Sequence, residues 1–329
     1  MMFALLTLFV AVATLSVRFR SRCLFTSFTL FVAVATFLVH VVFFQLFNVS
    51  QETVNARRAL NVPSGTNNRA QATNLYLCRM HIPTGKKIYF ASDNHLGAPD
   101  HAASLPREKK FVKWLDKAKD DAAAIFLLGD LFDFWFEYKS VVPKGFTRTL
   151  GKLAEITDSG IPVYYFVGNH DLWMNGYFEE ELNIPVYHKP QVFEFNDKKF
   201  FIGHGDGLGP GDKGYKRMKK VFTNPIAKWF YRWLHPDLGV RLAQYLSVKN
   251  KLISGDDDIK FIGEENEWLA QYSKKKLETA HYDYFIFGHR HLPMEIEVGE
   301  NSKYVNLGDW IHHYTYAVFD GEKLELKKY

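Results

Sequence analysis

Five short polar clusters hold the residue types that could carry chemistry in this sequence. Each contains Asp, His or Asn, none contains Cys, and each directly follows an apolar run. They occupy residues 92–95, 129–133, 168–171, 203–206 and 288–291. Carboxylate oxygens together with imidazole nitrogens suit Mn²⁺, Fe or Zn²⁺, whereas a thiolate zinc finger would need cysteines. The clusters therefore predict a metal site.

The number of ligand-type side chains predicts two ions. Asp93 and His95 are two positions apart, so on an extended strand end they would face the same side, and His289 and His291 repeat this spacing. The candidate ligands are Asp93, His95, Asp130, Asn169, His204, His289 and His291. They are too many for one ion. They suit two ions that share a bridging carboxylate, an arrangement that can activate water for attack at phosphorus.

The elements that would position these clusters are short strands alternating with helices. Strand-like runs lie at 87–91, 124–128, 162–167, 200–202 and 284–287. Phe111, Trp114, Leu115 and Ala118 recur at helical spacing, and so do Leu150, Leu153 and Ile156. A hairpin is expected over 192–202, and an all-β end over 294–326. The pattern predicts a layered α/β fold with the clusters at carboxyl ends of strands. A glycine opens four of the five clusters, at 129, 168, 203 and 288, which suits a turn with an unusual dihedral angle.

The five motifs in this order resemble the calcineurin-like metallophosphoesterases. The motifs are Asp-x-His, Gly-Asp-x-x-Asp, Gly-Asn-His-Asp, Gly-His-x-Asp and Gly-His-x-His, and the resemblance covers residues 86–329. It implies a four-layer αββα sandwich and two divalent ions, for which we expect Mn²⁺. By resemblance, one ion would take Asp93, His95, Asp130 and His291, and the other Asp130, Asn169, His204 and His289. Asp130 would then be the bridge.

The same resemblance implies a catalytic role for His170, beside the ligands Asp130 and Asn169. His170 would stabilise charge or protonate the leaving oxygen. The alternative is that His170 is hydrogen-bonded to Asp171, which only orients its ring, and that it has no catalytic role. Asp133 and Asp206 are expected to support the ligands rather than to bind an ion themselves.

Three local strings narrow the resemblance to the UDP-2,3-diacylglucosamine hydrolases of lipid A biosynthesis. They are GDLFDFW at 129–135, HGDGLGPGDKGY at 204–215 and an insertion at about 213–281. The likeness implies substrate contacts at Asp212 and Tyr215. Ser247, Lys249 and Lys251 could contact the nucleotide or phosphate, or simply form a solvated helix face. The chain departs from that family at His170, where Arg is common, and at Asn94.

The insertion carries aromatic and basic residues together. Its apolar side chains recur at helical spacing and comprise Met218, Phe222, Ile226, Trp229, Phe230 and Trp233. Lysines are interspersed, so the stretch predicts a basic amphipathic helix that forms a lid, lies at a membrane surface or caps an acyl-chain pocket. The alternative is an ordinary helix whose apolar stripe packs on the main domain.

The charge of the chain is concentrated at its N-terminal end. The net charge is +5, but residues 1–80 carry +6 and the remainder −1, so the basic pI does not indicate a nucleic-acid partner, and we expect none. Residues 24–47 are uncharged and long enough to span a bilayer. Residues 1–79 are therefore either a membrane anchor with a linker or translated upstream sequence before a start at Met80. Residues 80–329 would form the metallophosphoesterase domain.

The resemblance implies cleavage of UDP-2,3-diacylglucosamine to UMP and 2,3-diacylglucosamine 1-phosphate at the cytoplasmic face of the inner membrane. The partners would be this UDP-linked glycolipid and the membrane surface. A phosphodiesterase or nucleotide hydrolase of broad specificity is one alternative, and a non-catalytic metal-binding scaffold is another. A composition with 47% hydrophobic residues excludes a disordered chain and a small disulfide-stapled one. The sequence leaves the oligomeric state open.

Overall fold

The computed structural model describes residues 77–209, 213–243, 261 and 263–329. They belong to a compact unit that starts at Thr73. Its first strand, β1 (Leu77–Met80), lies across the boundary that we predicted between residues 79 and 80. The candidate membrane span at 24–47 lies outside the described residues. Within the described ranges, no helix has the length and apolar character needed to cross a bilayer.

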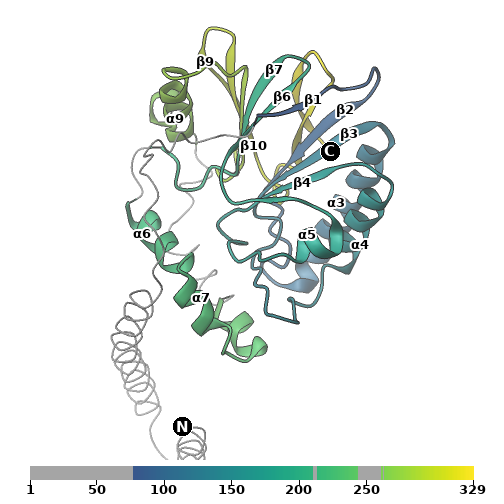
Figure 1. Cartoon of the computed structure of the whole chain (residues 1–329), viewed down its shortest axis with the longest axis vertical. Coiled ribbons are helices and arrows are strands. Elements are labelled where there is room, and N and C mark those ends of the chain that lie inside the picture. Colours follow the sequence, from purple (N-terminus) through teal and green to yellow (C-terminus); the bar gives the residue numbers. More distant parts are fainter. Residues whose placement is uncertain (1–76, 210–212, 244–260, 262) are drawn as a thin grey trace, which may run out of the picture. The chain divides into compact units, whose positions relative to one another are not determined.

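Two mixed six-stranded sheets form the centre of the domain (Figure 1). The first has the strand order β1, β6 (Gln191–Phe195), β7 (Lys198–Ile202), β8 (Tyr284–Phe287), β10 (Ser302–Leu307) and β9 (Pro293–Gly299). The second has the order β12 (Leu324–Lys328), β11 (Thr315–Phe319), β2 (Lys87–Ala91), β3 (Ala122–Leu128), β4 (Val163–Phe166) and β5 (Val186–Tyr187). Strands β2 to β5 are parallel, and so are β7, β8 and β10.

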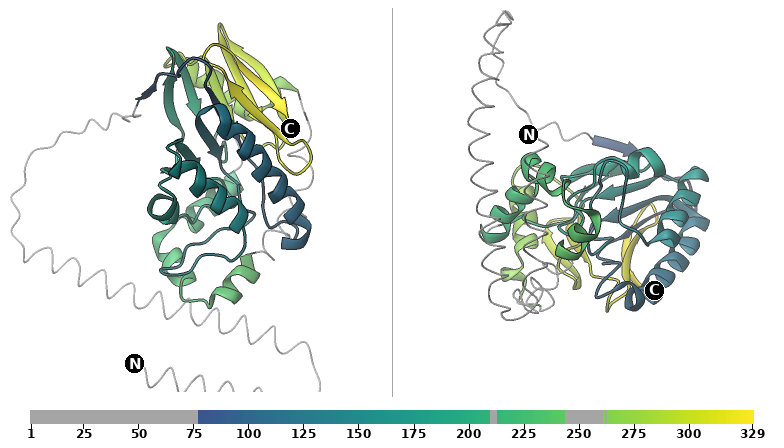
Figure 2. Two further views of the ribbon diagram at one scale, coloured as in Figure 1. Left: turned by 90° about the vertical axis from the view of Figure 1, so that its right-hand side faces the viewer. Right: turned by 90° about the horizontal axis from the view of Figure 1, so that it is seen from below.

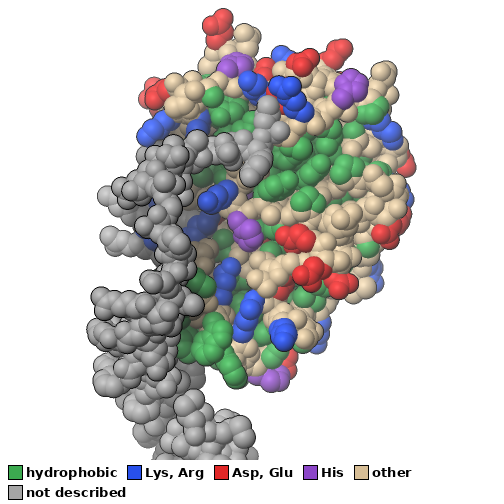
Figure 3. Space-filling view, in the orientation of Figure 1, with side chains coloured by type: hydrophobic (Ala, Val, Ile, Leu, Met, Phe, Trp, Pro, Cys, Tyr) green, Lys and Arg blue, Asp and Glu red, His purple; other side chains and the backbone are tan. Residues whose placement is uncertain are grey.

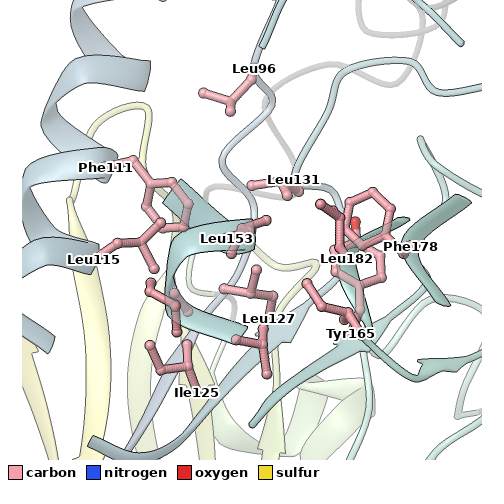
Figure 4. Close-up of a cluster of buried hydrophobic side chains, with 14 of the residues drawn as sticks. Leu96, Phe111, Leu115, Ile125, Leu127, Leu131, Leu153, Tyr165, Phe178 and Leu182 are labelled. Atoms are coloured by element: carbon pink, nitrogen blue, oxygen red, sulfur yellow. The ribbon is translucent and has the colours of Figure 1, made fainter. Parts of the chain in front are cut away.

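Three hydrophobic clusters hold these sheets in four layers. The central cluster lies between the sheets and joins Phe90 and Phe126 to Phe193 and Phe200. On the outer face of the second sheet pack α3 (His101–Asp121), α4 (Thr147–Asp158) and α5 (Tyr177–Leu182) (Figure 4). On the outer face of the first sheet packs α9 (Trp268–Leu277), which Figure 1 places on the opposite side from α3 and α4. The predicted αββα sandwich is confirmed.

Residues 213–233 of the insertion form two helices where the spacing of their apolar residues suggested one. These are α6 (Lys213–Phe222) and α7 (Pro225–Tyr231). The two helices are separate because Asn224 is the N-cap of α7. Its side-chain oxygen accepts a hydrogen bond from the backbone N–H of Ile226 at 2.8 Å, and Pro225 is the first residue of α7. The prediction of a single helix was wrong at this point. In the right-hand view of Figure 2, α6 and α7 lie at the end of the domain away from α3 and α4.

The face of α7 and the residues after it is apolar and exposed. Trp229, Phe230 and Trp233 are 53%, 39% and 73% exposed. The alternative that this stripe packs on the main domain is therefore wrong for these three residues. Phe222 at the end of α6 does pack inward, because Trp173 donates its indole N–H to the Phe222 carbonyl at 2.6 Å and the two rings are in contact.

An ion pair at the start of β2 makes a pH-dependent contribution to the unfolding free energy of the domain. Asp121 accepts hydrogen bonds from Lys87 at 2.7 Å and from the Tyr89 hydroxyl at 2.6 Å. Partial burial raises the pKa of the Asp121 carboxyl, but these two hydrogen bonds outweigh it and hold the pKa below its usual value. A lowered folded-state pKa stabilises the protein above pH about 4, and this stability is lost as the pH falls through the folded-state pKa.

The Asp121→Asn variant is expected to lose about 1 kcal/mol of unfolding free energy at pH 7. The difference from the wild-type protein should shrink as the pH falls below about 4, because the wild-type carboxyl is then protonated as well. Urea denaturation at pH 7 and pH 3 measures both values. Equal destabilisation at the two pH values would contradict this account.

Candidate active site

Both sheets deliver polar loops to the same place. Asp93 follows β2, Asp130 follows β3 and Asn169 follows β4. From the other sheet, His204 follows β7 and His289 follows β8. The two sets meet where the backbone N–H of His289 donates to the Asp93 carboxylate at 2.9 Å. The predicted clusters therefore converge at the carboxyl ends of parallel strands, as the α/β pattern indicated.

The ligand candidates themselves adopt the unusual backbone conformations. Asp93, His95, Asp130, His289 and His291 all have φ between 43° and 70°. Pairs two residues apart therefore do not sit on extended strand ends, and the predicted reason for their alignment was wrong. The left-handed region costs a non-glycine residue about 1 kcal/mol or more and is concentrated at functional sites.

The glycines of the clusters serve two different purposes. Gly129 has φ +85°, as the turn interpretation predicted. Gly168 and Gly288 do not adopt positive φ, and their role is to leave space. A Cβ on Gly168 would lie 2.2 Å from Asp130 Oδ1, and one on Gly288 would lie 2.3 Å from Asp93 Oδ2. These carboxylates can occupy their places only because no side chain stands there.

One group of candidate ligands contains Asp93, His95 and His291. The Nε2 atoms of His95 and His291 are 3.1 Å apart, and His291 Nε2 is 3.4 Å from Asp93 Oδ1. His95 Nε2 also lies 3.7 Å from Asp130 Oδ2. The family resemblance implied that these four residues hold one ion, and the structure brings them together.

A second group shares Asp130 with the first. His204 Nε2 is 3.4 Å from Asp130 Oδ2 and 3.1 Å from the side-chain oxygen of Asn169. His289 Nδ1 lies 2.9 Å from the same Asn169 oxygen. Asp130 Oδ2 therefore faces both groups, while its Oδ1 accepts the backbone N–H of His170 at 2.8 Å. This is the arrangement that a bridging carboxylate needs.

The pKa values of two histidines in the site are consistent with the binding of divalent cations. Burial lowers the pKa of His95 to about 3, so its imidazole is neutral and one ring nitrogen has a lone pair that can bind a cation. Burial acts in the same direction on His204, but the Asp130 carboxylate outweighs it and raises the pKa to about 10. His204 thus holds a proton against Asp130 at neutral pH, and a divalent ion at this place would replace that proton.

A buried oxygen of the Asp93 carboxylate also supports a cation site at this place. Asp93 Oδ1 is completely buried and has no hydrogen-bond partner among the described residues, although two imidazole nitrogens lie within 4 Å of it. Burying a carboxylate oxygen without a hydrogen bond is unfavourable unless a bound cation interacts with it. Oxygen and imidazole donors without thiolate suit hard or borderline divalent ions, so the residues present fit the metal centre that the sequence predicted.

His170 lies beside the first group of ligands. One of its ring nitrogens is within 4.8 Å of ligand atoms of His95 and Asp130. Its Nδ1 is 2.9 Å from the backbone carbonyl oxygen of Asp133. Asp171 does not orient His170, because its carboxylate accepts instead from the backbone N–H groups of Gly168 at 2.7 Å and Leu131 at 3.1 Å. The alternative that Asp171 orients His170 was therefore wrong.

The His170→Gln variant is expected to lower kcat by about 100-fold while the bound metal content stays unchanged. The reason is that His170 lies beside the candidate ligands and its imidazole is placed to transfer a proton. Steady-state kinetics together with elemental analysis of the same preparation provide the check. Loss of metal in this variant would instead make His170 a ligand.

Sequence reasoning missed Asp309. It follows β10, and its Oδ2 lies 3.6 Å from Nδ1 of His291, on the opposite side of the ring from the ligand atom Nε2. Its Oδ1 accepts from the backbone N–H groups of His312 and His313 at 2.9 Å each. A carboxylate in this position fixes the orientation of a ligating histidine. The signal was a Gly-Asp pair at 308–309 directly after a strand, as at 129–130.

Of the two aspartates expected to support the ligands, Asp133 lies beside a candidate ligand and Asp206 contacts a lysine of the insertion. Asp133 Oδ1 lies 3.4 Å from His95 Nδ1. Asp206 pairs with Lys219 of α6 at 2.5 Å, which ties the insertion to the loop that carries His204. The predicted substrate contacts Asp212, Ser247, Lys249 and Lys251 lie outside the described residues. Tyr215 is on α6, and its side chain is also outside the description.

A family model described as calcineurin-like phosphoesterase matches residues 86–293, the stretch that supplies the seven candidate ligands and His170. The chain belongs to the calcineurin-like phosphoesterase family. As a member of this family it is a metal-dependent hydrolase of phosphoric esters, and the described residues offer candidate ligand groups for divalent ions.

Relatives of this phosphoesterase share a common name. UDP-2,3-diacylglucosamine hydrolase of Porphyromonas gingivalis is 39% identical over 255 residues, covering 73% of this chain and 97% of that protein. The protein of the same name from Shewanella sp. is 27% identical over 224 residues, covering 68% of this chain and 89% of that protein. The solved structure of Yfce, a phosphoesterase from E. coli, aligns with a TM-score of 0.37 at 16% identity, over 74% of this chain and 92% of that one.

Proposed function

We propose that this phosphoesterase hydrolyses UDP-2,3-diacylglucosamine to UMP and 2,3-diacylglucosamine 1-phosphate in lipid A biosynthesis. The observation that carries the proposal is the pairing of two ligand groups on Asp130 with an insertion that is basic and apolar. The relatives named UDP-2,3-diacylglucosamine hydrolase support it, because this chain matches nearly the whole length of the P. gingivalis protein.

The metal centre in this proposal holds two divalent ions, with Mn²⁺ as the expected metal. Asp93, His95, Asp130 and His291 would hold one ion. The other would be held by Asp130, Asn169, His204 and His289. Such ions lower the pKa of water and polarise phosphoryl oxygens.

The side chains around the centre have separate tasks. The Asp133 backbone carbonyl accepts from Nδ1 of His170, which leaves Nε2 for the substrate. In the protonated imidazole, Nε2 would donate to a phosphoryl oxygen or to the leaving oxygen on the lipid phosphate. Asp133 and Asp309 hold the rings of His95 and His291 from behind, so that the ligand nitrogens stay aimed at the centre.

The insertion would bind the lipid part of the substrate. Lys216 donates to the Gly209 carbonyl at 2.7 Å and Lys219 to Asp206, so α6 is fastened beside the metal loops. On the face drawn in Figure 3, Lys and Arg side chains lie between a group of hydrophobic side chains and the rest of the domain. Cationic groups suit the diphosphate, and the exposed aromatic side chains suit acyl chains or a bilayer surface. We further propose that the enzyme works at the cytoplasmic face of the inner membrane, where lipid A biosynthesis would supply this substrate.

Incubation of the purified protein with Mn²⁺ and UDP-2,3-diacylglucosamine tests the proposal by mass spectrometry of the products. The expected products are UMP and the diacylglucosamine phosphate. Hydrolysis of simple phosphodiesters without any UMP would favour a phosphodiesterase of broad specificity instead. Absence of bound metal and of all hydrolysis would favour the non-catalytic scaffold.

A further inference from the structure

Arg290 stands between the two candidate ligands His289 and His291, yet its side chain is turned into the protein. The residue is fully buried, with 0% of its surface exposed. The histidines on either side have φ of 70° and 53°, and the backbone N–H of Arg290 donates to the carbonyl of Gly288 at 2.8 Å. The loop therefore alternates, with two side chains aimed at the centre and the middle one anchored behind it.

The anchor of Arg290 is Glu267 at the far end of the insertion. Arg290 Nε lies 3.1 Å from both carboxylate oxygens of Glu267, and Glu267 is also 0% exposed. The guanidinium stacks over the ring of Trp268 at 4.5 Å from its centroid. Glu267 is the N-cap residue of α9, so it sits on an element that packs firmly on the first sheet.

Stability alone does not account for such a pair. Removing two charges from water is unfavourable, and apolar residues of similar volume often replace a buried ion pair without loss. What a guanidinium held between a carboxylate and an indole ring does provide is a fixed direction, because its planar fork matches the carboxylate in few orientations.

We propose that Arg290, fixed by Glu267, is a positioning residue that sets the directions of His289 and His291 toward the two ions. The contacts that hold the rest of the loop include the His289 N–H on Asp93 Oδ2 at 2.9 Å, Asn306 Nδ2 on the Gly288 carbonyl at 2.5 Å, and Asp309 Oδ2 at 3.6 Å from His291 Nδ1. Arg290 fixes its middle. The C-terminal end of the insertion is thereby part of the metal centre. The inference rests on the proposed ligand roles of the two histidines.

The decisive experiment measures Mn²⁺ affinity by calorimetry on metal-free protein, with thermal unfolding of the same samples. The double variant Arg290→Met/Glu267→Met removes both charges together. We expect it to unfold near the wild-type temperature but to bind Mn²⁺ about 10- to 100-fold more weakly. Its kcat should fall, with KM little changed. Wild-type Mn²⁺ affinity in the folded double variant would overturn the proposal.

A second variant covers the case in which the double variant does not fold. Arg290→Lys keeps the charge but loses the fork, so it should fold and still bind Mn²⁺ more weakly than the wild-type protein. Wild-type affinity in this variant would also overturn the proposal. The matched control is the pair Lys303–Glu295, 3.0 Å apart on β10 and β9, whose replacement by two Met residues should leave Mn²⁺ affinity unchanged.

A histidine variant separates failure of this inference from failure of the proposed function. His291→Ala should lose Mn²⁺ affinity outright if His291 is a ligand. If it binds Mn²⁺ like the wild-type protein, the ligand assignment itself is wrong. If His291→Ala loses affinity while Arg290→Lys and the double variant keep it, only the positioning role is wrong.

Discussion

The Asp130→Asn variant is expected to lower hydrolysis of the lipid substrate by at least about 1,000-fold. Asp130 Oδ2 faces both His95, at 3.7 Å, and His204, at 3.4 Å. An ion contributes several kcal/mol to stabilising a phosphoryl-transfer transition state, and about 4 kcal/mol corresponds to about 1,000-fold in rate. Asn offers a neutral NH₂ group at that place, which cannot bridge two cations.

The variant should still fold. Asn keeps an oxygen that can accept the backbone N–H of His170, the contact that Asp130 Oδ1 makes at 2.8 Å. Elemental analysis should find fewer than two ions for each chain, while circular dichroism remains that of the wild-type protein. The control is Asp158→Asn, which changes an exposed carboxylate at the end of α4 and should leave rate and metal content unaltered. A folded Asp130→Asn protein with both ions and full activity would refute the bridging role.

The triple variant Trp229→Ser/Phe230→Ser/Trp233→Ser is expected to raise KM for the lipid substrate by about 10- to 100-fold. These side chains are exposed in the protein alone, so their removal should not weaken the fold. Burial of a large apolar side chain against a lipid contributes about 1.5–3 kcal/mol, and only part of it need be realised to shift KM by this amount. Binding to liposomes with anionic headgroups should fall in parallel.

Hydrolysis of a water-soluble phosphodiester distinguishes a lipid-binding role from damage to the centre. Its kcat/KM should stay at the wild-type value in the triple variant, because the aromatic residues do not touch the candidate ligands. Val141→Ser serves as the matched control, since Val141 is an exposed apolar residue outside the insertion. An unchanged KM for the lipid substrate in the triple variant would contradict the proposed role of the insertion.

The sequence predicted the strands and the convergence of the clusters because both depend on short-range patterns. The run at 284–287, for example, is apolar throughout and is a buried strand, and Gly-His-x-His follows it directly. Strands β1 and β5 escaped prediction because β5 has only two residues and because β1, with the sequence LCRM, contains Arg79 and is therefore not a continuous apolar run.

Other features depended on contacts that sequence spacing does not encode. The alignment of Asp93 with His95 comes from positive φ angles that tertiary contacts impose, whereas the spacing had suggested an extended strand. Asp309 reaches His291 through the packing of β10 beside β8, and Glu267 reaches Arg290 from α9. The break at Asn224 and Pro225 was visible in the sequence, but the regular spacing of aromatic residues on both sides concealed it.

The measurement that tests the central claim most directly is a single turnover of UDP-2,3-diacylglucosamine in ¹⁸O-labelled water with Mn²⁺-loaded protein. A centre that directs water to the phosphorus next to uridine puts one ¹⁸O atom into UMP and none into the diacylglucosamine phosphate. Label in the lipid phosphate would place the attack on the other phosphorus. Formation of no UMP at all, by a protein that holds two ions, would contradict the assignment of this substrate to this site.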